Sequence, residues 1–239
     1  MSAQDFVRIE QRDAYLWITL DRAAKANALA VSMMEGATRA LKAAQESESV
    51  QAVLITGAGE RVFCAGVDVR EQPVDGDMHA HRRRRASRLA ELLDSIMDTP
   101  KPIIAVLNGT ASGGGAMLAL LADARVAAES ASLALPEIDL GLSTFTGAAI
   151  AECMGGLALA VDLVQSGRRM PAREALTRGL ITAVAAPAEL EQAATRVADV
   201  LAKKDPHAFA ANKRWLNRRL KSALADARQE HDRHREQRA

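Results

Sequence analysis

Aromatic side chains are scarce in this 239-residue chain, and neither sign of charge dominates. Phe, Trp and Tyr together make up 3% of the residues, and 31 Lys and Arg nearly balance 30 Asp and Glu, for a net charge of +1. Few rings leave little surface for stacking nucleic-acid bases. A balanced charge gives no general attraction to phosphate backbones or anionic membranes. We therefore expect neither nucleic acid nor a membrane as a partner.

Cysteines and long apolar runs are equally scarce. The two cysteines, Cys64 and Cys153, make neither a disulfide framework nor a C-x-x-C metal pair. The N-terminal segment lacks the apolar core of a signal peptide, and no run reaches the roughly 18 apolar residues of a membrane span. The histidines form no ligand cluster and receive no role: His79, His81, His207, His231 and His234. These absences predict a cytoplasmic protein without a metal.

The rest of the composition is that of a globular domain, with 49% hydrophobic and 26% charged residues. Hydrophobic periodicity predicts an initial hairpin and then helices that alternate with short buried strands. The predicted strands cover residues 6–10, 15–20, 52–56, 103–107, 125–128 and 132–135. Between them we expect a helix over 31–46, a second that ends at Met97 before Pro100, and a third from the glycine run to Leu121.

Beyond Gly141 the periodicity is helical. The predicted helices cover residues 148–154, 157–165, 172–178, 190–201 and 208–229. We therefore divide the chain into a core with the functional site, residues 1–187, and a helical C-terminal region, residues 188–239. The mixed charges of 218–239 are typical of a solvated helix face.

Three segments combine glycine runs with a carboxylate. They are 56–68, which contains Phe63-Cys64-Ala65-Gly66-Val67-Asp68, then 108–115, which ends in three glycines, and 135–141, which contains Pro136-Glu137. Glycines at strand ends let successive N–H groups point into one cavity. Converging N–H donors stabilise the negative charge that develops on an acyl carbonyl oxygen.

The third segment supplies a carboxylate. Glu137 follows an apolar strand, where partial burial raises the pKa of a carboxyl toward neutrality and suits it to move protons. Alternative interpretations remain for each segment alone. Pro136-Glu137 is also a good first turn of a helix, and the triple glycine is also a packing device that lacks the Gly-Lys-Ser/Thr ending of a phosphate loop.

Together and in this order, the segments resemble the crotonase, or enoyl-CoA hydratase/isomerase, family. The family pattern appears here as Asn27-Ala28-Leu29, as 57–68, as Asn108-Gly109 with 112–115, and as 136–141. The resemblance extends from about residue 5 to about residue 220. It implies an α/β fold, a spiral of ββα units with an α-helical C-terminal part that forms trimers or hexamers.

The resemblance also implies an acyl-CoA thioester substrate, with coenzyme A as part of the substrate and no further cofactor. The backbone N–H groups of Val67 and Gly114 would form an oxyanion hole, and Glu137 would be the catalytic carboxylate. Ala65, Asp68 and Gly113 would lie against the substrate. Arg70 and Lys213 match basic residues that meet the CoA phosphates, and the run 82–85 with Arg88 is a further candidate for phosphates.

One departure from the family pattern bears on the reaction. Hydratases of the family carry a second glutamate two residues after the glycine run, where this chain has Met117. A single base still moves a proton along an enoyl thioester, so we expect double-bond isomerisation and keep enoyl-CoA hydration as the alternative. The 141–147 segment also departs from the family pattern, which leaves the acyl group open.

Two other classes of function remain. Clp-type peptidases share a related architecture, and Ser112 lies beside the glycine run, but no G-x-S-x-G elbow surrounds it. Some relatives are non-catalytic scaffolds, yet both glycine loops and Glu137 are retained here.

Overall fold

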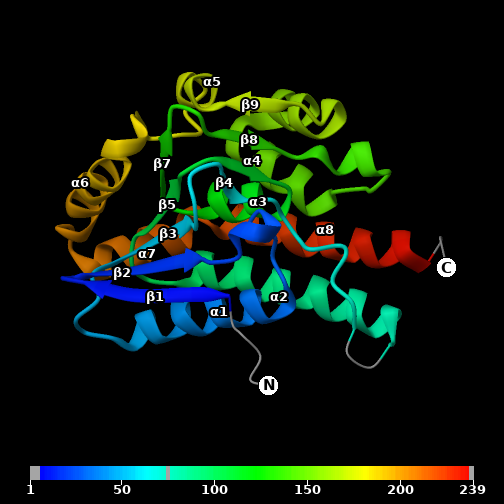
Figure 1. Ribbon diagram of the computed structural model, residues 1–239, viewed down its shortest axis with the longest axis horizontal. Helices are drawn as coiled ribbons and strands as arrows, with labels where there is room; N and C mark the ends of the chain where they lie inside the picture. Colours follow the sequence, from blue (N-terminus) through cyan, green and yellow to red (C-terminus); the bar gives the residue numbers. More distant parts are fainter. Residues whose placement is uncertain (1–5, 74–75, 237–239) are drawn as a thin grey trace.

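The computed structural model describes residues 6–73 and 76–236 and contains two β-sheets flanked by helices (Figure 1). The larger sheet has the strand order β1-β2-β3-β5-β7-β10, and the smaller has the order β4-β6-β8-β9. The larger sheet comprises β1 Val7–Arg12, β2 Tyr15–Leu20, β3 Ala52–Gly57, β5 Ile103–Leu107, β7 Ala124–Ala128 and β10 Ala183–Ala185. The smaller sheet comprises β4 Val62–Cys64, β6 Thr110–Ser112, β8 Ser132–Ala134 and β9 Arg169–Pro171.

The N-terminal hairpin is confirmed and forms one edge of the larger sheet. β1 and β2 pair antiparallel, with Val7 opposite Leu20, around a turn in which Asp13 has φ +52°. From β2 onward the neighbouring strands are parallel. Every residue of β5 and β7 is buried, as expected for parallel strands covered on both faces.

A ββα unit repeats along the chain. A strand of the larger sheet is followed by a strand of the smaller sheet and then by a helix: β3, β4 and α2, then β5, β6 and α3, then β7, β8 and α4. These helices are α2 Met78–Asp98, α3 Gly114–Leu121 and α4 Phe145–Ala160. The predicted spiral of ββα units is therefore present in the structure.

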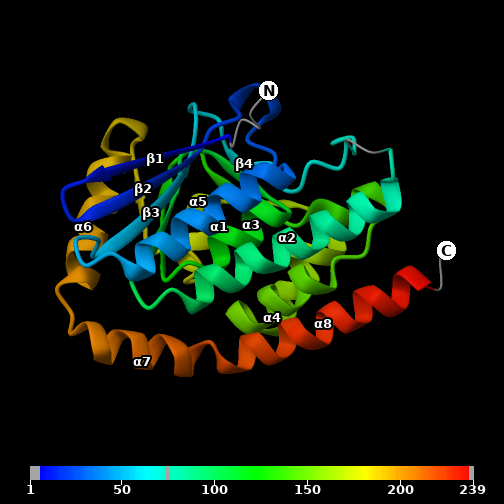
Figure 2. The ribbon, with the colours of Figure 1, turned by 90° about the horizontal axis from the view of Figure 1, so that it is seen from below.

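Three helices cover the sheets in places that the sequence pattern indicates. The apolar stripe of α1, Val31–Glu46, packs beside α2 (Figures 1 and 2). The short α5, Ala172–Thr177, packs on β8, β9 and β10. α6, Leu190–Ala202, packs on β3, β5 and β7, so it belongs with the core although it follows the predicted boundary at residue 187. Residues 1–5 and 237–239, at the ends of the two predicted regions, lie outside the described residues.

The C-terminal helix predicted over 208–229 is wrong in extent, because the structure has two helices there. α7, Pro206–Leu216, and α8, Arg218–Glu236, meet at Asn217, and both lie along the same edge of the molecule (Figure 2). The Asn217 side chain donates to the Met97 carbonyl at 3.3 Å. This contact ties the break to the end of α2, and α8 then runs beside α4.

The two helices predicted over 148–154 and 157–165 form one helical run, Phe145–Gln165, kinked where Gly156 takes φ +79°. An 18-residue stretch of this run has a mean hydropathy of 1.6, and 33% of that stretch is buried. By length and composition it meets the criterion for a membrane-spanning helix, contrary to the expectation from the sequence. Leu157 and Val161 leave 67% and 51% of their surface exposed. This run therefore has an apolar face that the described residues leave exposed.

Candidate active site

The three motif segments meet at one edge of the smaller sheet. β4, β6 and β8 are parallel neighbours, so the loops at their carboxyl ends lie side by side. Residues 65–68 follow β4, the triple glycine follows β6, and the single turn Pro136–Leu140 follows β8. The fold thus brings together segments that are far apart in the sequence.

The loop after β4 and the loop after β6 lie so close together that Gly66 has no room for a side chain. Gly66 has φ +93°, and a β-carbon added to it would lie 2.9 Å from the Ser112 carbonyl oxygen and 3.2 Å from the Gly114 nitrogen. Leu29 bridges to the same loop, donating to the Gly66 carbonyl at 2.8 Å and accepting from the Asp68 amide at 3.0 Å. The Val67 amide lies between these two groups, and it donates to no acceptor among the described residues.

The triple glycine begins helix α3. Gly113 has φ +52° and ψ −125°, a conformation that only glycine adopts without strain. Gly115 lets the helix pack directly on β4, because a β-carbon there would lie 2.4 Å from the Cys64 carbonyl oxygen. As the first residue of α3, Gly114 has an N–H with no acceptor inside the helix, and it lies at the positive end of the helix dipole.

Glu137 lies against the triple glycine. A β-carbon added to Gly113 would be 3.3 Å from Oε1 of Glu137, which accepts a hydrogen bond from the Thr144 hydroxyl at 3.3 Å. Oε2 is buried and has no partner among the described residues. Burial raises the pKa of this carboxyl above its ordinary value, and its interaction with its own backbone amide and the bond from Thr144 oppose the rise only in part. The carboxyl is therefore suited to holding and releasing a proton.

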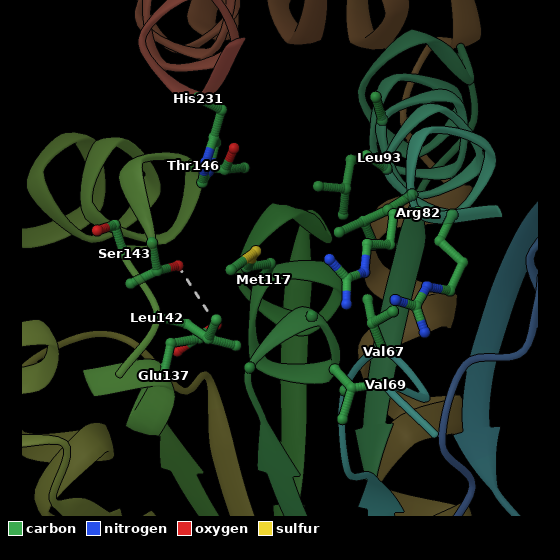
Figure 3. Close-up of a pocket in the computed structure, with 18 of the residues that line it drawn as sticks. Val67, Val69, Arg82, Leu93, Met117, Glu137, Leu142, Ser143, Thr146 and His231 are labelled. Atoms are coloured by element: carbon green, nitrogen blue, oxygen red, sulfur yellow. Dashed lines mark hydrogen bonds between the residues drawn. The ribbon is translucent and has the colours of Figure 1, made fainter. Parts of the chain in front are cut away.

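These groups line one cavity of about 640 Å³ (Figure 3). Met117, one turn into α3, has 4% of its surface exposed, and its thioether points into the same hollow as Glu137. Other apolar lining residues are Val67, Val69, Leu89, Leu93 and Leu142. The volume falls in the usual range for small-molecule sites.

Sequence comparison assigns this arrangement to a family. Residues 10–237 match the family model for enoyl-CoA hydratase/isomerase. The carnitinyl-CoA dehydratase of Proteus mirabilis is 36% identical over 214 residues, which cover 87% of this chain and 78% of that protein. The short-chain-enoyl-CoA hydratase of Clostridium acetobutylicum is 30% identical over 226 residues, which cover 92% of this chain and 84% of that protein.

The chain belongs to the enoyl-CoA hydratase/isomerase family. A crystal structure of an enoyl-CoA hydratase from Bacillus anthracis matches the fold with a TM-score of 0.83 at 31% identity, over 97% of this chain and 90% of that chain. The predicted crotonase fold class is thereby confirmed. Trimer formation stays a prediction.

Six of the site residues predicted from the family pattern line the cavity, and three, Asp68, Arg70 and Lys213, do not. Those that line it are Ala65, Val67, Gly113, Gly114, Met117 and Glu137. Asp68, in contrast, pairs with Arg22 at 2.6 Å and accepts from the Arg70 amide at 3.0 Å. Arg70 is exposed and lies outside the cavity lining. Asp68 therefore braces the loop that carries Val67, and the expected contact of Asp68 with substrate does not fit its placement.

Lys213 also does not lie where a CoA-binding family lysine was expected. Its side chain is 4% exposed, and its ammonium pairs with Asp123 at 2.6 Å and donates to the Lys101 carbonyl at 3.2 Å. Burial lowers the pKa of Lys213 and raises that of Asp123, against their mutual attraction. Through its contacts with Asp123 and Lys101, Lys213 holds α7 against residues that flank β5 and β7. It does not line the cavity.

The family asparagines hold the loops in shape. Asn27, which is fully buried, donates to the carbonyls of Ala58 and Val62 at 2.9 and 2.8 Å. Asn108 accepts from the Gly57 amide at 3.1 Å and donates to the Gly59 carbonyl at 2.7 Å. Both satisfy backbone groups of the loops around β4 that the irregular chain path leaves unpaired.

Helix α8 supplies a wall of the cavity that the sequence analysis missed. Its contributing residues are Arg228, His231, Asp232 and Arg235. His231 packs edge-on against Phe145 with ring centroids 4.9 Å apart, and burial lowers its pKa, assisted by the charge of Arg235. No motif marks these residues, because the cavity contact exists only once α8 lies against α4.

Ser112 also lines the cavity, as a hydrolytic nucleophile would. Among the described residues its hydroxyl makes no hydrogen bond to a histidine, and the serine–histidine contact that is present joins Ser143 to His234 at 3.3 Å on the exposed rim. The geometry of a serine hydrolase is therefore missing from the described part of the chain.

Proposed function

We propose that the chain is an enoyl-CoA isomerase, in which Glu137 carries a proton from one carbon of the acyl chain to another. The observation behind the proposal is the pairing of Glu137 with Met117 in one cavity. Glu137 is a buried carboxyl with a free oxygen, whereas the thioether of Met117 neither donates nor takes up a proton. At these two positions the chain therefore has one acid–base group where hydratases of the family pattern have two.

In the proposed reaction, ionised Glu137 removes a proton from the carbon next to the thioester of a 3-enoyl-CoA. The electron pair moves into the carbonyl, and the amides of Val67 and Gly114 donate hydrogen bonds to the resulting oxyanion. Glu137 then returns the proton to the fourth carbon, which leaves the double bond between the second and third carbons. No atom is gained or lost, so the reaction balances without an additional cofactor.

Enoyl-CoA hydration is the second candidate, and the relatives favour it. The relatives include a carnitinyl-CoA dehydratase and a short-chain-enoyl-CoA hydratase. In that reaction the free Oε2 of Glu137 would hold and activate water, with Thr144 on the other oxygen. Hydration then rests on one carboxylate instead of two.

We also propose that the protein assembles into a homotrimer or a hexamer and acts in the cytoplasm. The exposed apolar residues of the helical run Phe145–Gln165 support an association between copies, since large uncovered apolar faces mark interaction sites.

Proton transfer by Glu137 is tested by hydrogen exchange. In D₂O a proton carried by an exchangeable carboxyl is replaced by deuterium, so 2-enoyl-CoA recovered from the enzyme gains deuterium at its fourth carbon, as measured by NMR. Glu137→Gln abolishes this incorporation while the protein still binds CoA. Incorporation that persists at the wild-type rate in Glu137→Gln would contradict the proposal.

A further inference from the structure

The cavity wall formed by α2 and α8 is rich in arginine. Five arginines contribute to it: Arg82, Arg83, Arg85, Arg228 and Arg235. Such a concentration is unexpected beside the apolar side chains that line the rest of the cavity. This wall indicates a ligand only if some of the positive charges have no acceptor within the protein.

Three of the five arginines make hydrogen bonds or ion pairs with other residues of the protein. Arg85 is buried and donates to the Asp68 carbonyl at 2.7 Å. Arg228 makes a two-bond contact with Asp94 at 2.7 and 2.9 Å. Arg235 pairs with Asp232 at 2.6 Å.

The next arginine, Arg83, lies near Asp77 at the start of α2. The pKa of Asp77 is lowered chiefly by the amide of Ala80 and further by the charge of Arg83. Outside the cavity lining, Arg84 pairs with Glu35 at 3.0 Å and Arg88 pairs with both Glu35 and Glu91. The acidic side chains on this part of the surface therefore interact with arginines other than Arg82.

Within residues 6–73 and 76–236, neither Arg82 nor Arg83 makes an ion pair or a hydrogen bond to an acceptor, but Arg83 lies near the carboxylate of Asp77. Arg82 is therefore the cavity arginine on which a ligand anion is considered. Figure 3 shows it on the wall that faces Glu137, with Met117 between the two. Arg82 is exposed, so water solvates its charge in the free protein. An apolar ligand that displaced this water would leave the charge unpaired, which is costly, whereas an anionic group would form two parallel hydrogen bonds with it.

We propose that Arg82 binds a carboxylate on the acyl part of the thioester, so that the substrate is an acyl-CoA whose acyl chain ends in a carboxylate. This deepens the proposed function, because it rests on the thioester lying against Val67, Gly114 and Glu137. Arg82 faces the same hollow as Glu137, where the reacting carbons lie, whereas Arg70 lies outside it. Arg82 is thus a specificity-determining residue, and the phosphates of CoA are the competing source of the anion.

The experiment compares matched pairs of saturated thioesters, which bind without turnover and so report on Arg82 even if the reaction is not isomerisation. Calorimetry with the full chain measures butyryl-CoA against succinyl-CoA, hexanoyl-CoA against adipyl-CoA, and octanoyl-CoA against suberyl-CoA, with free CoA as the reference ligand. We expect at least one dicarboxylic thioester to bind about tenfold or more tightly than its partner, because a charge-assisted hydrogen bond is worth that much.

Arg82→Gln removes this preference and leaves the affinity for free CoA and for the monocarboxylic thioesters unchanged. Arg82→Lys retains part of it, since lysine keeps the charge without the two-bond geometry. Arg84→Gln is the matched control: it removes the same charge two positions along the exposed part of α2 and leaves the preference intact. If no pair shows a preference in wild-type protein, or if Arg82→Gln weakens free CoA as much as the dicarboxylic thioesters, the proposal is overturned.

Discussion

Glu137 and Gly113 are packed so closely that a β-carbon on Gly113 would lie 3.3 Å from Oε1 of the glutamate. The glycine therefore does two things at once. It takes a conformation with φ +52° that leads into α3, and it leaves room for the carboxyl beside the Gly114 amide. The position of the proposed base and that of the proposed oxyanion donor are coupled through this contact.

Gly113→Ala should therefore damage catalysis more than folding. The added methyl group pushes the carboxyl of Glu137 away from its position and strains the backbone, so we expect kcat to fall by about tenfold to a hundredfold. Gly179→Ala is the control, because Gly179 has φ +73° but no atom within 4 Å of an added β-carbon. It should cost about 1 kcal/mol or more of stability and leave kcat unchanged. Equal kcat values for Gly113→Ala and wild type would contradict this coupling.

The buried carboxyl of Glu137 predicts a pH dependence of both activity and stability. Activity requires the ionised form, so kcat should fall as the pH drops through the raised pKa, above the ordinary value of 4.5. The stability of the folded protein depends on pH in the opposite direction. The folded protein binds the proton more tightly than the unfolded chain, so the contribution of Glu137 is present below pH 4.5 and lost as the pH rises through the folded pKa.

Glu137→Gln, which does not ionise, should therefore raise the melting temperature at neutral pH. The expected gain is about 2 to 4 °C for each kcal/mol recovered, and the difference should shrink below pH 4.5. Calorimetric scans of both proteins between pH 4 and pH 8 measure it. A variant less stable than wild type at neutral pH would show that the carboxylate has a stabilising partner.

Lys213 and Asp123 should behave as a buried structural pair. Lys213→Met leaves the Asp123 carboxyl buried without its 2.6 Å partner, so we expect a loss of about 3 to 5 kcal/mol in urea-induced unfolding. The double variant Asp123→Asn, Lys213→Met should recover most of that loss, because no unpaired charge remains. The affinity for CoA should not change in either variant. A stable Lys213→Met protein that binds CoA weakly would restore the role expected from the family pattern.

The apolar face of Phe145–Gln165 predicts association. Light scattering at micromolar concentration should give wild-type protein a mass of several times the 25.5 kDa of one chain. Leu157→Asp places a charge on the exposed apolar face and should reduce the mass, whereas Leu176→Asp, on α5, should not. A strictly monomeric wild-type protein would contradict the proposed assembly.

Much of the fold is predictable from sequence, because the longer strands correspond to apolar runs that lie between turn residues. The prediction of a strand over 15–20 and a helix over 31–46 agrees with β2 and α1. β4, β6, β9 and β10 were not predicted as strands, because three residues are too few for a clear periodicity; β8 is equally short and was predicted. The break at Asn217 was missed because a tertiary contact with the Met97 carbonyl accompanies it, and no glycine or proline marks it.

The residues of the site likewise divide into those that a sequence motif predicts and those whose placement depends on tertiary contacts. Val67, Gly114 and Glu137 are found because each belongs to a motif whose glycines and carboxyl have a local physical reason to be there. The placement of Lys213 depends on a carboxylate 90 residues away in sequence, and the α8 wall depends on how the last helix docks. Neither leaves a local pattern, and a lysine on a helix looks the same in sequence whether it is buried or reaches a ligand.

The most direct test of the proposed reaction assays a 3-enoyl-CoA and a 2-enoyl-CoA of equal length side by side. We expect wild-type protein to isomerise the first with a higher kcat/KM than it hydrates the second. We also expect Met117→Glu, but not Met117→Gln, to raise hydration, because only the glutamate supplies a second acid–base group. Efficient hydration by wild-type protein, at or above the rate of isomerisation, would show that Glu137, alone or with another group of the cavity, activates water, and it would contradict the assignment as an isomerase.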